Sequence, residues 1–270
     1  MSFTLEKLTV RHLTGSRAPA LQALDLAIAP GEQLALIGPS GAGKTTLLST
    51  LALAHQPAEG GFRAFGQDPW ALPQRARHAL RARLFLAPQT PPLPPRQRVV
   101  TAVLAARLPQ WSLGQALASL FRPTDPDAAH DALARFGLGD KLYARVDRLS
   151  GGERQRCSLA RLLLSNAETF LVDEPISALD PALAQLTLAT LQGEAAARKA
   201  TLVCSLHQVE MARAHFARIV GLRAGRIVFD LPREQVSDEM IAALYANETP
   251  APPAHHLHET PERIAVGACF

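Results

Sequence analysis

A glycine-rich segment is the feature that most constrains this chain of 270 residues. It reads Gly38-Pro-Ser-Gly-Ala-Gly-Lys-Thr45, fits G-x-x-x-x-G-K-[ST], and directly follows the apolar run 33–37. Such glycines let successive backbone N–H groups turn toward one phosphate, while the lysine adds charge and the final hydroxyl binds Mg²⁺. The pattern predicts a buried strand, a phosphate-binding loop, and a helix over 44–54 whose positive end faces the anion. The residues expected around the phosphates are Gly38, Pro39, Ser40, Gly41, Ala42, Gly43, Lys44, Thr45 and Thr46.

Composition limits where such a chain can act. No run approaches the roughly 18 apolar residues of a membrane span, and the first residues lack a signal peptide's apolar stretch, so we expect a soluble, cytoplasmic protein. Cys157, Cys204 and Cys269 are widely spaced, which indicates reduced thiols and neither a disulfide framework nor a zinc site. The net charge of +4 comes without a nucleic-acid-binding motif, so no nucleic-acid partner is expected.

Short runs with the composition of β-strands recur along the chain. They cover 3–10, 23–29, 33–38, 83–87, 169–173, 201–205, 218–223 and 226–230. Runs 170–173 and 202–205 are nearly all apolar before a polar tip, which predicts central strands of a parallel sheet covered on both faces. Ligands of such sheets bind beyond the carboxyl ends of the strands.

The pattern changes in two places. From about residue 91 to residue 166, a proline-rich start is followed by helical stretches without a convincing strand, which predicts a helical subdomain inserted into the α/β body. Residues 247–270 begin with closely spaced prolines and no apolar period, so a mobile tail is expected. Three histidines in the tail, His255, His256 and His258, could bind a metal, but the lack of cysteine or carboxylate partners favours a solvated segment.

A second group of motifs narrows the class of phosphate-binding protein. The loop alone admits kinases, GTPases, motor ATPases and transport ATPases. The chain also carries Leu149-Ser-Gly-Gly-Glu-Arg-Gln155 and, after a helical interval, Thr169-Phe-Leu-Val-Asp-Glu174. With these segments it resembles the ATP-binding-cassette (ABC) ATPases over about residues 3–246.

This resemblance implies a fold and a role for each of six motifs that occur in family order. The implied fold is an α/β P-loop NTPase with a RecA-like parallel sheet core, an antiparallel β-subdomain and an inserted helical subdomain, within an ATPase domain over 1–246. The motifs are Walker A at 38–45, the Q-loop with Gln89, the signature at 149–155, Walker B at 170–174, the D-loop at 177–180 and the H-loop with His207.

Two adjacent carboxylates follow the run 169–172. Asp173 ends an apolar strand, where an unpaired carboxylate would be costly unless a metal ion or a donor met it. Glu174 would aim differently and could orient or deprotonate the attacking water, with a structural salt bridge as the alternative. Outside the family context, Gln89 and His207 would be ordinary loop residues. The resemblance implies catalytic roles for Glu174, His207 and Lys44, and an Mg²⁺ site formed by Thr45, Gln89 and Asp173.

The signature has a structural and a functional interpretation. Ser150 and Glu153 form a capping box that would start a helix over 153–165 in any protein. Gly151 and Gly152 weaken such a start unless a close backbone approach is needed, and a glycine-containing helix N-terminus can bind an anion. The family usually has glutamine where Glu153 stands. The glutamate adds a negative charge near the expected γ-phosphate, so its side chain must point back to the cap for the site to work. Similarly, Asp180-Pro181 predicts an N-cap and a first helical turn.

The expected cofactors are ATP and Mg²⁺, although the adenine contact departs from the family pattern. Family members usually stack an aromatic side chain on the adenine near the end of the first strand. The segment 8–13 contains no Tyr, Phe or Trp, and His12 is the residue that could stack there with less contact area.

The resemblance also implies partners. In this family the signature of one subunit faces the P-loop of another, so Ser150, Gly151 and Gly152 would complete the partner's ATP site in a homodimer. Without a membrane span of its own, the chain is expected at the cytoplasmic face of the inner membrane on a separate permease, with a solute-binding protein acting indirectly. Segments 99–121, 205–210 and 218–222 are similar to the phosphonate importer ATPases, so we expect uptake of phosphonate or a related phosphorus oxyanion. An ATPase of an exporter or a lipoprotein-release system, and a non-transport ABC ATPase of DNA repair or translation, stay as alternatives.

Overall fold

The computed structural model describes residues 1–11, 19–121 and 124–246. The predictions for His12, for Cys269 and for the tail 247–270 with its three histidines therefore lie outside the described residues. Within the described ranges, no helix is both long and apolar enough to cross a membrane.

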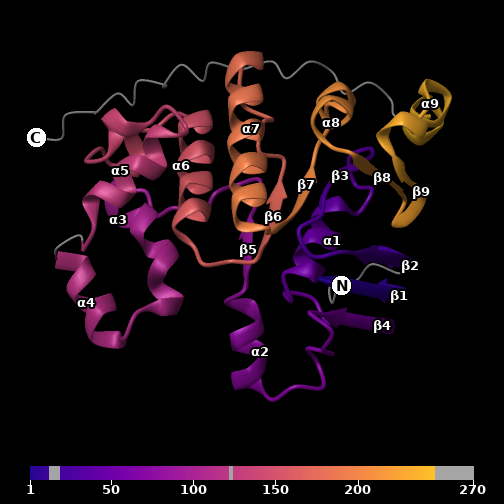
Figure 1. The fold of residues 1–270 in the computed structure, drawn as a ribbon, viewed down its shortest axis with the longest axis horizontal. Helices are drawn as coiled ribbons and strands as arrows, with labels where there is room; N and C mark the ends of the chain where they lie inside the picture. The colour runs from indigo at the N-terminus through magenta and orange to yellow at the C-terminus, as the bar shows by residue number, and fades with distance from the viewer. Residues whose placement is uncertain (12–18, 122–123, 247–270) are drawn as a thin grey trace, which may run out of the picture.

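A six-stranded sheet forms the centre of the molecule (Figure 1). Its order is β5-β6-β7-β3-β8-β9, and β9 pairs with β8 in the antiparallel direction. The other neighbouring pairs are parallel. The strands are β3 (Gln33–Ile37), β5 (Leu84–Ala87), β6 (Thr169–Asp173), β7 (Thr201–Ser205), β8 (Arg218–Arg223) and β9 (Arg226–Pro232). This arrangement confirms the predicted parallel sheet core.

Both faces of this sheet are covered, as the apolar runs predicted. Along β3, Leu34 and Leu36 pack on one face, whereas Ala35 and Ile37 pack on the other, because successive side chains of a strand point to opposite faces. Helix α1 (Lys44–Leu51) covers the first face, and α7 (Pro181–Arg198) and α8 (Val209–His215) cover the second. Helix α1 ends before the predicted residue 54 because Leu53 adopts a left-handed backbone, with φ 60°.

A second, antiparallel sheet has the order β2-β1-β4, which confirms the expected β-subdomain. Its strands are β1 (Phe3–Val10), β2 (Leu21–Ile28) and β4 (Glu59–Ala64). Strand β4 was not predicted, because its two adjacent glycines lower the strand propensity of the run. Gly60 is required there: its φ is 85°, and a Cβ would lie 2.3 Å from the carbonyl oxygen of Lys7 on β1.

The helical segment lies to one side of the sheet in Figure 1. Its helices are α3 (Val99–Leu104), α4 (Leu113–Phe121), α5 (Pro126–Ala134) and α6 (Gly151–Leu164), joined by short 3₁₀ turns, and the described part of 91–166 holds no strand. Phe136 from this segment shares one buried core with Phe170 of β6 and Leu188 of α7. The segment therefore packs directly on the sheet, and its domain boundaries at 91 and 166 stay a prediction.

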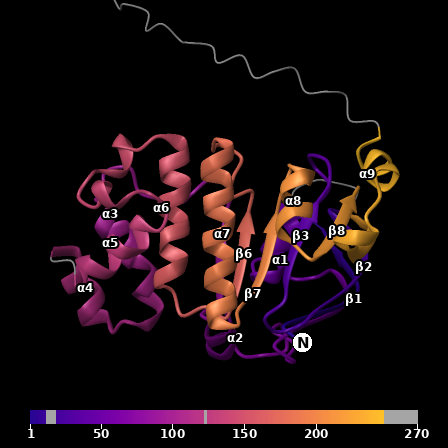
Figure 2. The same ribbon diagram turned by 45° about the horizontal axis from the view of Figure 1, so that its top comes forward.

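Two further helices lie outside these layers. Helix α2 (Gln74–Arg81) precedes β5, and α9 (Asp238–Tyr245) follows β9. Figure 2 shows α2 below α7 and α9 at the right-hand end of the molecule. Cys157 on α6 and Cys204 on β7 are free and buried. Burial raises the pKa of the Cys157 thiol to about 12 and also raises the pKa of Cys204, so both thiols stay protonated near neutral pH.

An ion-pair cluster fastens the helical segment to α7. Glu194 is 8% exposed and pairs with Arg135, just after α5, and with Arg198, one turn further along α7. Thr190 of α7 also donates a hydrogen bond to the carbonyl of Arg135. The Arg198 guanidinium reaches the carbonyls of Ser165 and Leu163 after and within α6. The cluster thus joins α5, α6 and α7.

We expect Glu194→Ala to lower the free energy of unfolding by about 2 kcal/mol, because two guanidiniums lose their carboxylate while Arg135 stays partly solvated. Urea unfolding with linear extrapolation measures this change. Glu239→Ala, at an exposed position in the first turn of α9, is the control and should lower the free energy of unfolding far less, because an exposed carboxylate near a helix N-terminus stabilises the helix only weakly. Equal shifts for both variants would show that the cluster adds nothing to stability.

Candidate functional site

The predicted phosphate-binding loop and the polar tips of two neighbouring strands meet at one edge of the central sheet. The loop follows β3, Asp173 ends β6, and β7 lies between these strands and leads to His207. A pocket of about 450 Å³ opens here. It is lined by Ala20, Ser40, Gly41, Ala42, Gly43, Lys44, Thr45, Thr46, Gln89, Glu174 and His207. The structure thus brings most of the predicted site residues together. Gly38, Pro39 and Asp173 do not line the pocket, but each accepts a hydrogen bond from Lys44 or Thr45, which do.

The loop is shaped by backbone geometry that only glycine supports at its first position. Gly38 has φ 149°, and a Cβ there would lie 2.0 Å from the carbonyl oxygen of Leu222 on β8. Lys44 is 5% exposed, and its ammonium donates to the carbonyls of Gly38 at 2.6 Å and Pro39 at 3.1 Å. The lysine therefore spans the loop to which it belongs.

Helix α1 starts at this loop without a side-chain cap. Its N-cap is Gly43, in a left-handed conformation with φ 106°, and its first turn contains no acidic residue. The first N–H groups of a helix have no partner within the helix, and the helix dipole makes this end positive. The start of α1 therefore suits a phosphate group.

Asp173 is buried, with 3% exposed, and two hydroxyl groups meet its carboxylate. Thr45 donates from Oγ1 to Oδ2 at 2.7 Å, and Ser205 donates from Oγ to Oδ1 at 2.5 Å. A carboxylate beside a threonine hydroxyl is the hard-oxygen donor set that Mg²⁺ prefers together with phosphate oxygens. The residues present therefore fit a magnesium ion at Thr45 and Asp173.

Glu174 points into the pocket, away from Asp173. Its carboxylate lies between Gln89, whose Nε2 donates to Oε2 at 2.7 Å, and His207, whose Nε2 is 2.5 Å from Oε1. Its backbone is left-handed, with φ 49°, which is unusual for a residue other than glycine. Gln89, predicted as a magnesium ligand, thus contacts Glu174 in this structure.

The signature forms the predicted capping box but starts its helix two residues earlier than expected. Ser150 is the N-cap of α6; its N–H donates to Glu153 Oε2 at 2.7 Å, and Glu153 N–H donates to Ser150 Oγ at 3.2 Å. The hydrogen bond from the Ser150 N–H lowers the pKa of Glu153, and Lys141, 3.8 Å away, lowers it further. Glu153 thus points back to the cap, as expected.

The signature residues do not line the pocket of their own chain. Ser150, Gly151 and Gly152 are absent from the residues around the P-loop pocket. The neighbouring D-loop ends as predicted, because Asp180 caps α7 through a 3.0 Å bond from Leu183 N–H, and Pro181 is the first helical residue.

Three residues that contact the site were not predicted from the sequence. The Tyr245 hydroxyl on α9 accepts a 3.1 Å hydrogen bond from the N–H of Gly38. Gln155 on α6 donates from Nε2 to the carbonyl of Glu174, and Ser205 contacts both Asp173 and Glu174. Ser205 had a local signal, as the polar tip of an apolar strand, whereas Tyr245 had none.

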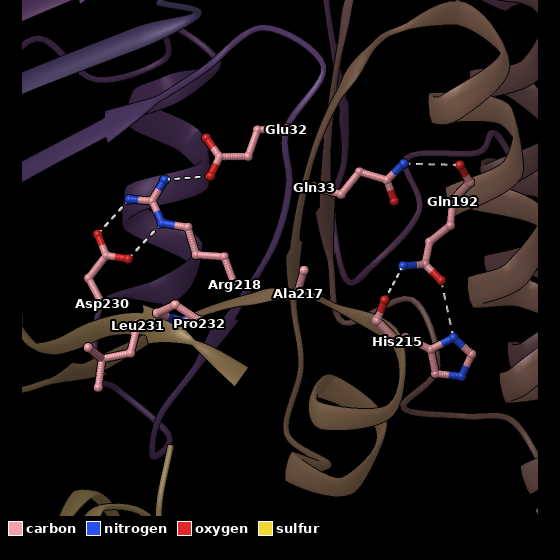
Figure 3. A pocket seen from close by; sticks show the side chains of 9 residues that line it. All are labelled: Glu32, Gln33, Gln192, His215, Ala217, Arg218, Asp230, Leu231 and Pro232. Atoms are coloured by element: carbon pink, nitrogen blue, oxygen red, sulfur yellow. Dashed lines mark hydrogen bonds and ion pairs between the residues drawn. The ribbon is translucent and has the colours of Figure 1, made fainter. Parts of the chain in front are cut away.

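A second pocket, of about 410 Å³, lies at the opposite, amino-terminal edge of the sheet (Figure 3). Arg218 is held there by Asp230 and Glu32, which raise the pKa of its guanidinium. Gln192 pairs with His215 through both its side-chain nitrogen and its oxygen. These polar groups are paired with one another and do not offer a site for phosphate. The first pocket is therefore the candidate phosphate-binding site.

Comparisons with known proteins agree with this geometry. A family model described as "ABC transporter" matches residues 21–177. The chain is 56% identical over 261 residues to "Phosphonates import ATP-binding protein PhnC 2" of Albidiferax ferrireducens, covering 96% of this chain and 91% of that protein. It is 52% identical over 255 residues to "Phosphonates import ATP-binding protein PhnC" of Pseudomonas fluorescens, covering 93% and 96%.

Solved structures share the fold. A dimeric ATP-binding cassette in a post-hydrolysis state, bound to ADP and Pi, superposes with a TM-score of 0.73 at 24% identity, over 86% of this chain and 98% of that one. The cbiO1 protein of Clostridium perfringens, part of the transporter complex cbiONQ, gives a TM-score of 0.72 at 19% identity, over 90% and 94%. At these identities the likeness confirms the architecture alone.

Proposed function

Because this chain belongs to the ABC transporter family, we propose that it is the ATP-hydrolysing subunit of an importer for phosphonates or a related phosphorus oxyanion. The observation that carries the ATPase activity is the position of Glu174 between Gln89 and His207, beside the P-loop. The cargo is proposed from the relatives, whose names specify phosphonate import and which are 50–56% identical over at least 90% of this chain.

ATP would be held by its phosphates. The loop N–H groups and the start of α1 would bind the β- and γ-phosphates, and Lys44 would turn its ammonium from the carbonyls of Gly38 and Pro39 toward them. Thr45 and Asp173 would hold Mg²⁺, which neutralises developing negative charge on the phosphate oxygens.

Hydrolysis requires a water molecule aligned with the γ-phosphate. Glu174 would orient this water and accept its proton, and the reaction yields ADP and inorganic phosphate. His207, 40% exposed beside Glu174, would turn its Nε2 from the Glu174 carboxylate to donate a hydrogen bond to the γ-phosphate. Gln89, just before the helical segment, would donate a hydrogen bond to the Glu174 carboxylate and so link this segment to the site of hydrolysis.

The site of one chain is incomplete without a second copy. Ser150, Gly151 and Gly152 do not line the pocket of their own chain. They begin α6, and the Glu153 carboxylate in its first turn is turned back to the Ser150 N–H. We therefore propose a head-to-tail homodimer in which these residues contact the γ-phosphate held by the partner. Loss of that phosphate would let the two copies separate, and this motion would drive a membrane permease from the cytoplasmic face.

The test is reconstitution with a candidate permease and its binding protein in proteoliposomes. We expect phosphonate-loaded binding protein to stimulate ATP hydrolysis and to support phosphonate uptake, whereas unloaded binding protein should do neither. Stimulation by another solute class, with no response to phosphonates or related phosphorus oxyanions, would contradict the proposed cargo. Absence of any ATP hydrolysis by the complex would contradict the ATPase itself.

A further inference from the structure

Ser205 lies between the two acidic residues of the site. It is the last residue of β7, its exposed fraction is 0%, and it pairs in register with Asp173 at the end of β6. His207 follows two residues later and contacts the Glu174 carboxylate. The end of β7 therefore borders both acidic residues.

The Ser205 hydroxyl group forms hydrogen bonds with both Asp173 and Glu174. Ser205 Oγ donates its proton to Asp173 Oδ1 at 2.5 Å and accepts the N–H of Glu174 at 3.0 Å. The same N–H also lies 3.2 Å from the Ser205 carbonyl oxygen. A serine hydroxyl has one donor and two acceptor positions, so both contacts are made at once.

The contact with Asp173 sets the direction of its carboxylate. Because Oδ1 is held by Ser205, Oδ2 is the oxygen that faces Thr45, at 2.7 Å. These are the two side chains that fit magnesium. Without the Ser205 hydroxyl, the carboxylate could rotate, and a buried oxygen would lose its donor.

The contact with Glu174 supports an unfavourable backbone. A left-handed conformation is unfavourable for a non-glycine residue, and Glu174 adopts one with φ 49°. Its N–H is held by Ser205, and its carbonyl accepts hydrogen bonds from Gln155 and Ser177. This backbone aims the carboxylate at Gln89 and His207.

We propose that Ser205 is a positioning residue for ATP hydrolysis, an inference that rests on the proposed ATPase function. Its hydroxyl turns Asp173 Oδ2 toward Thr45 and stabilises the backbone that points Glu174 into the pocket. Ser205 touches neither nucleotide nor water in this role. It acts by fixing the position of Asp173, the proposed magnesium ligand, relative to Glu174, the proposed general base.

A purely structural role for this hydroxyl makes a different prediction. If Ser205 only satisfied a buried charge, its loss would destabilise the fold, and activity would fall in proportion to the folded fraction. A positioning role instead changes how activity and ATP binding depend on the magnesium concentration. Binding of ATP in EDTA would stay as in the unmodified protein.

The experiment compares the full-length protein with Ser205→Ala and Ser205→Cys. We expect Ser205→Ala to lower kcat at least about tenfold and to raise the half-saturating Mg²⁺ concentration severalfold, because a hydrogen bond to a charged group contributes a factor of about 10 to 100. Ser205→Cys, which keeps a weak donor, should lie between. Affinity for ATP in EDTA should be equal in all three proteins.

Thr169→Val is the matched control, since it removes a buried, unbonded hydroxyl at the opposite end of β6. It should leave the magnesium dependence unchanged. Unchanged kcat and magnesium dependence in Ser205→Ala, or losses that match a fall in EDTA binding, would overturn the proposal. An unmodified protein without ATPase activity would contradict the proposed function instead, while the magnesium dependence of ATP binding would still test Ser205.

Discussion

Glu174→Gln is expected to lower the rate of ATP hydrolysis about a thousandfold while ATP stays bound. Glutamine has nearly the same shape and can still accept a hydrogen bond from Gln89, but it cannot take a proton from water. General-base catalysis typically contributes a factor of about 10² to 10⁴. Phosphate release under saturating Mg²⁺ and ATP measures the loss, and equilibrium binding measures the retained affinity.

The same variant should accumulate as a dimer when ATP is present. The γ-phosphate is not removed, so the proposed contact with Ser150, Gly151 and Gly152 of the second copy persists. Size-exclusion chromatography with and without ATP detects this change. Glu168→Gln is the control, because Glu168 forms an exposed ion pair with Arg83 at the far end of β6. Hydrolysis at the normal rate by Glu174→Gln would show that another group activates the water.

Lys44→Ala is expected to weaken ATP binding about a hundredfold. The ammonium is the positive charge buried in the loop, and its loss removes the charge-assisted bonds proposed to the phosphates. It also leaves the carbonyls of Gly38 and Pro39 without this donor, so the loop itself loses support. Equilibrium binding of ATP at fixed Mg²⁺ measures the change.

A control for Lys44 must remove a lysine charge without disturbing the loop. Lys199→Asn suits this purpose, because Lys199 is exposed at the end of α7 and asparagine tolerates its left-handed backbone, with φ 54°. Its ATP affinity should be unchanged. ATP binding by Lys44→Ala at the affinity of the unmodified protein would contradict the proposed role of Lys44.

The sequence predicted the elements whose signals are local. The two-face burial of β6 and β7 follows from their apolar runs. The Ser150–Glu153 capping box was also predicted, although α6 begins two residues before the expected position. The glycine spacing of the loop likewise predicted the turn between β3 and α1. Each of these features depends on residues that lie within a few positions of one another.

The elements that the sequence missed depend on distant partners. Strand β4 exists because Gly60 and Gly61 can lie against β1, although glycine weakens a strand considered alone. The bond between Tyr245 and Gly38 joins positions 207 residues apart. Only the folded arrangement shows that Gln89 contacts Glu174, or that Ser205 serves two acidic residues at once.

Helix α6 has a consequence for how two active centres would communicate. Its N-terminus carries Ser150, proposed to face the partner's nucleotide, and Gln155 on the same helix bonds the backbone of Glu174 in its own chain. Five helical residues span only about 8 Å. If this helix moves when the partner loses its phosphate, the movement would shift the backbone of Glu174. Hydrolysis at one ATP site of the dimer would therefore change the rate of hydrolysis at the other.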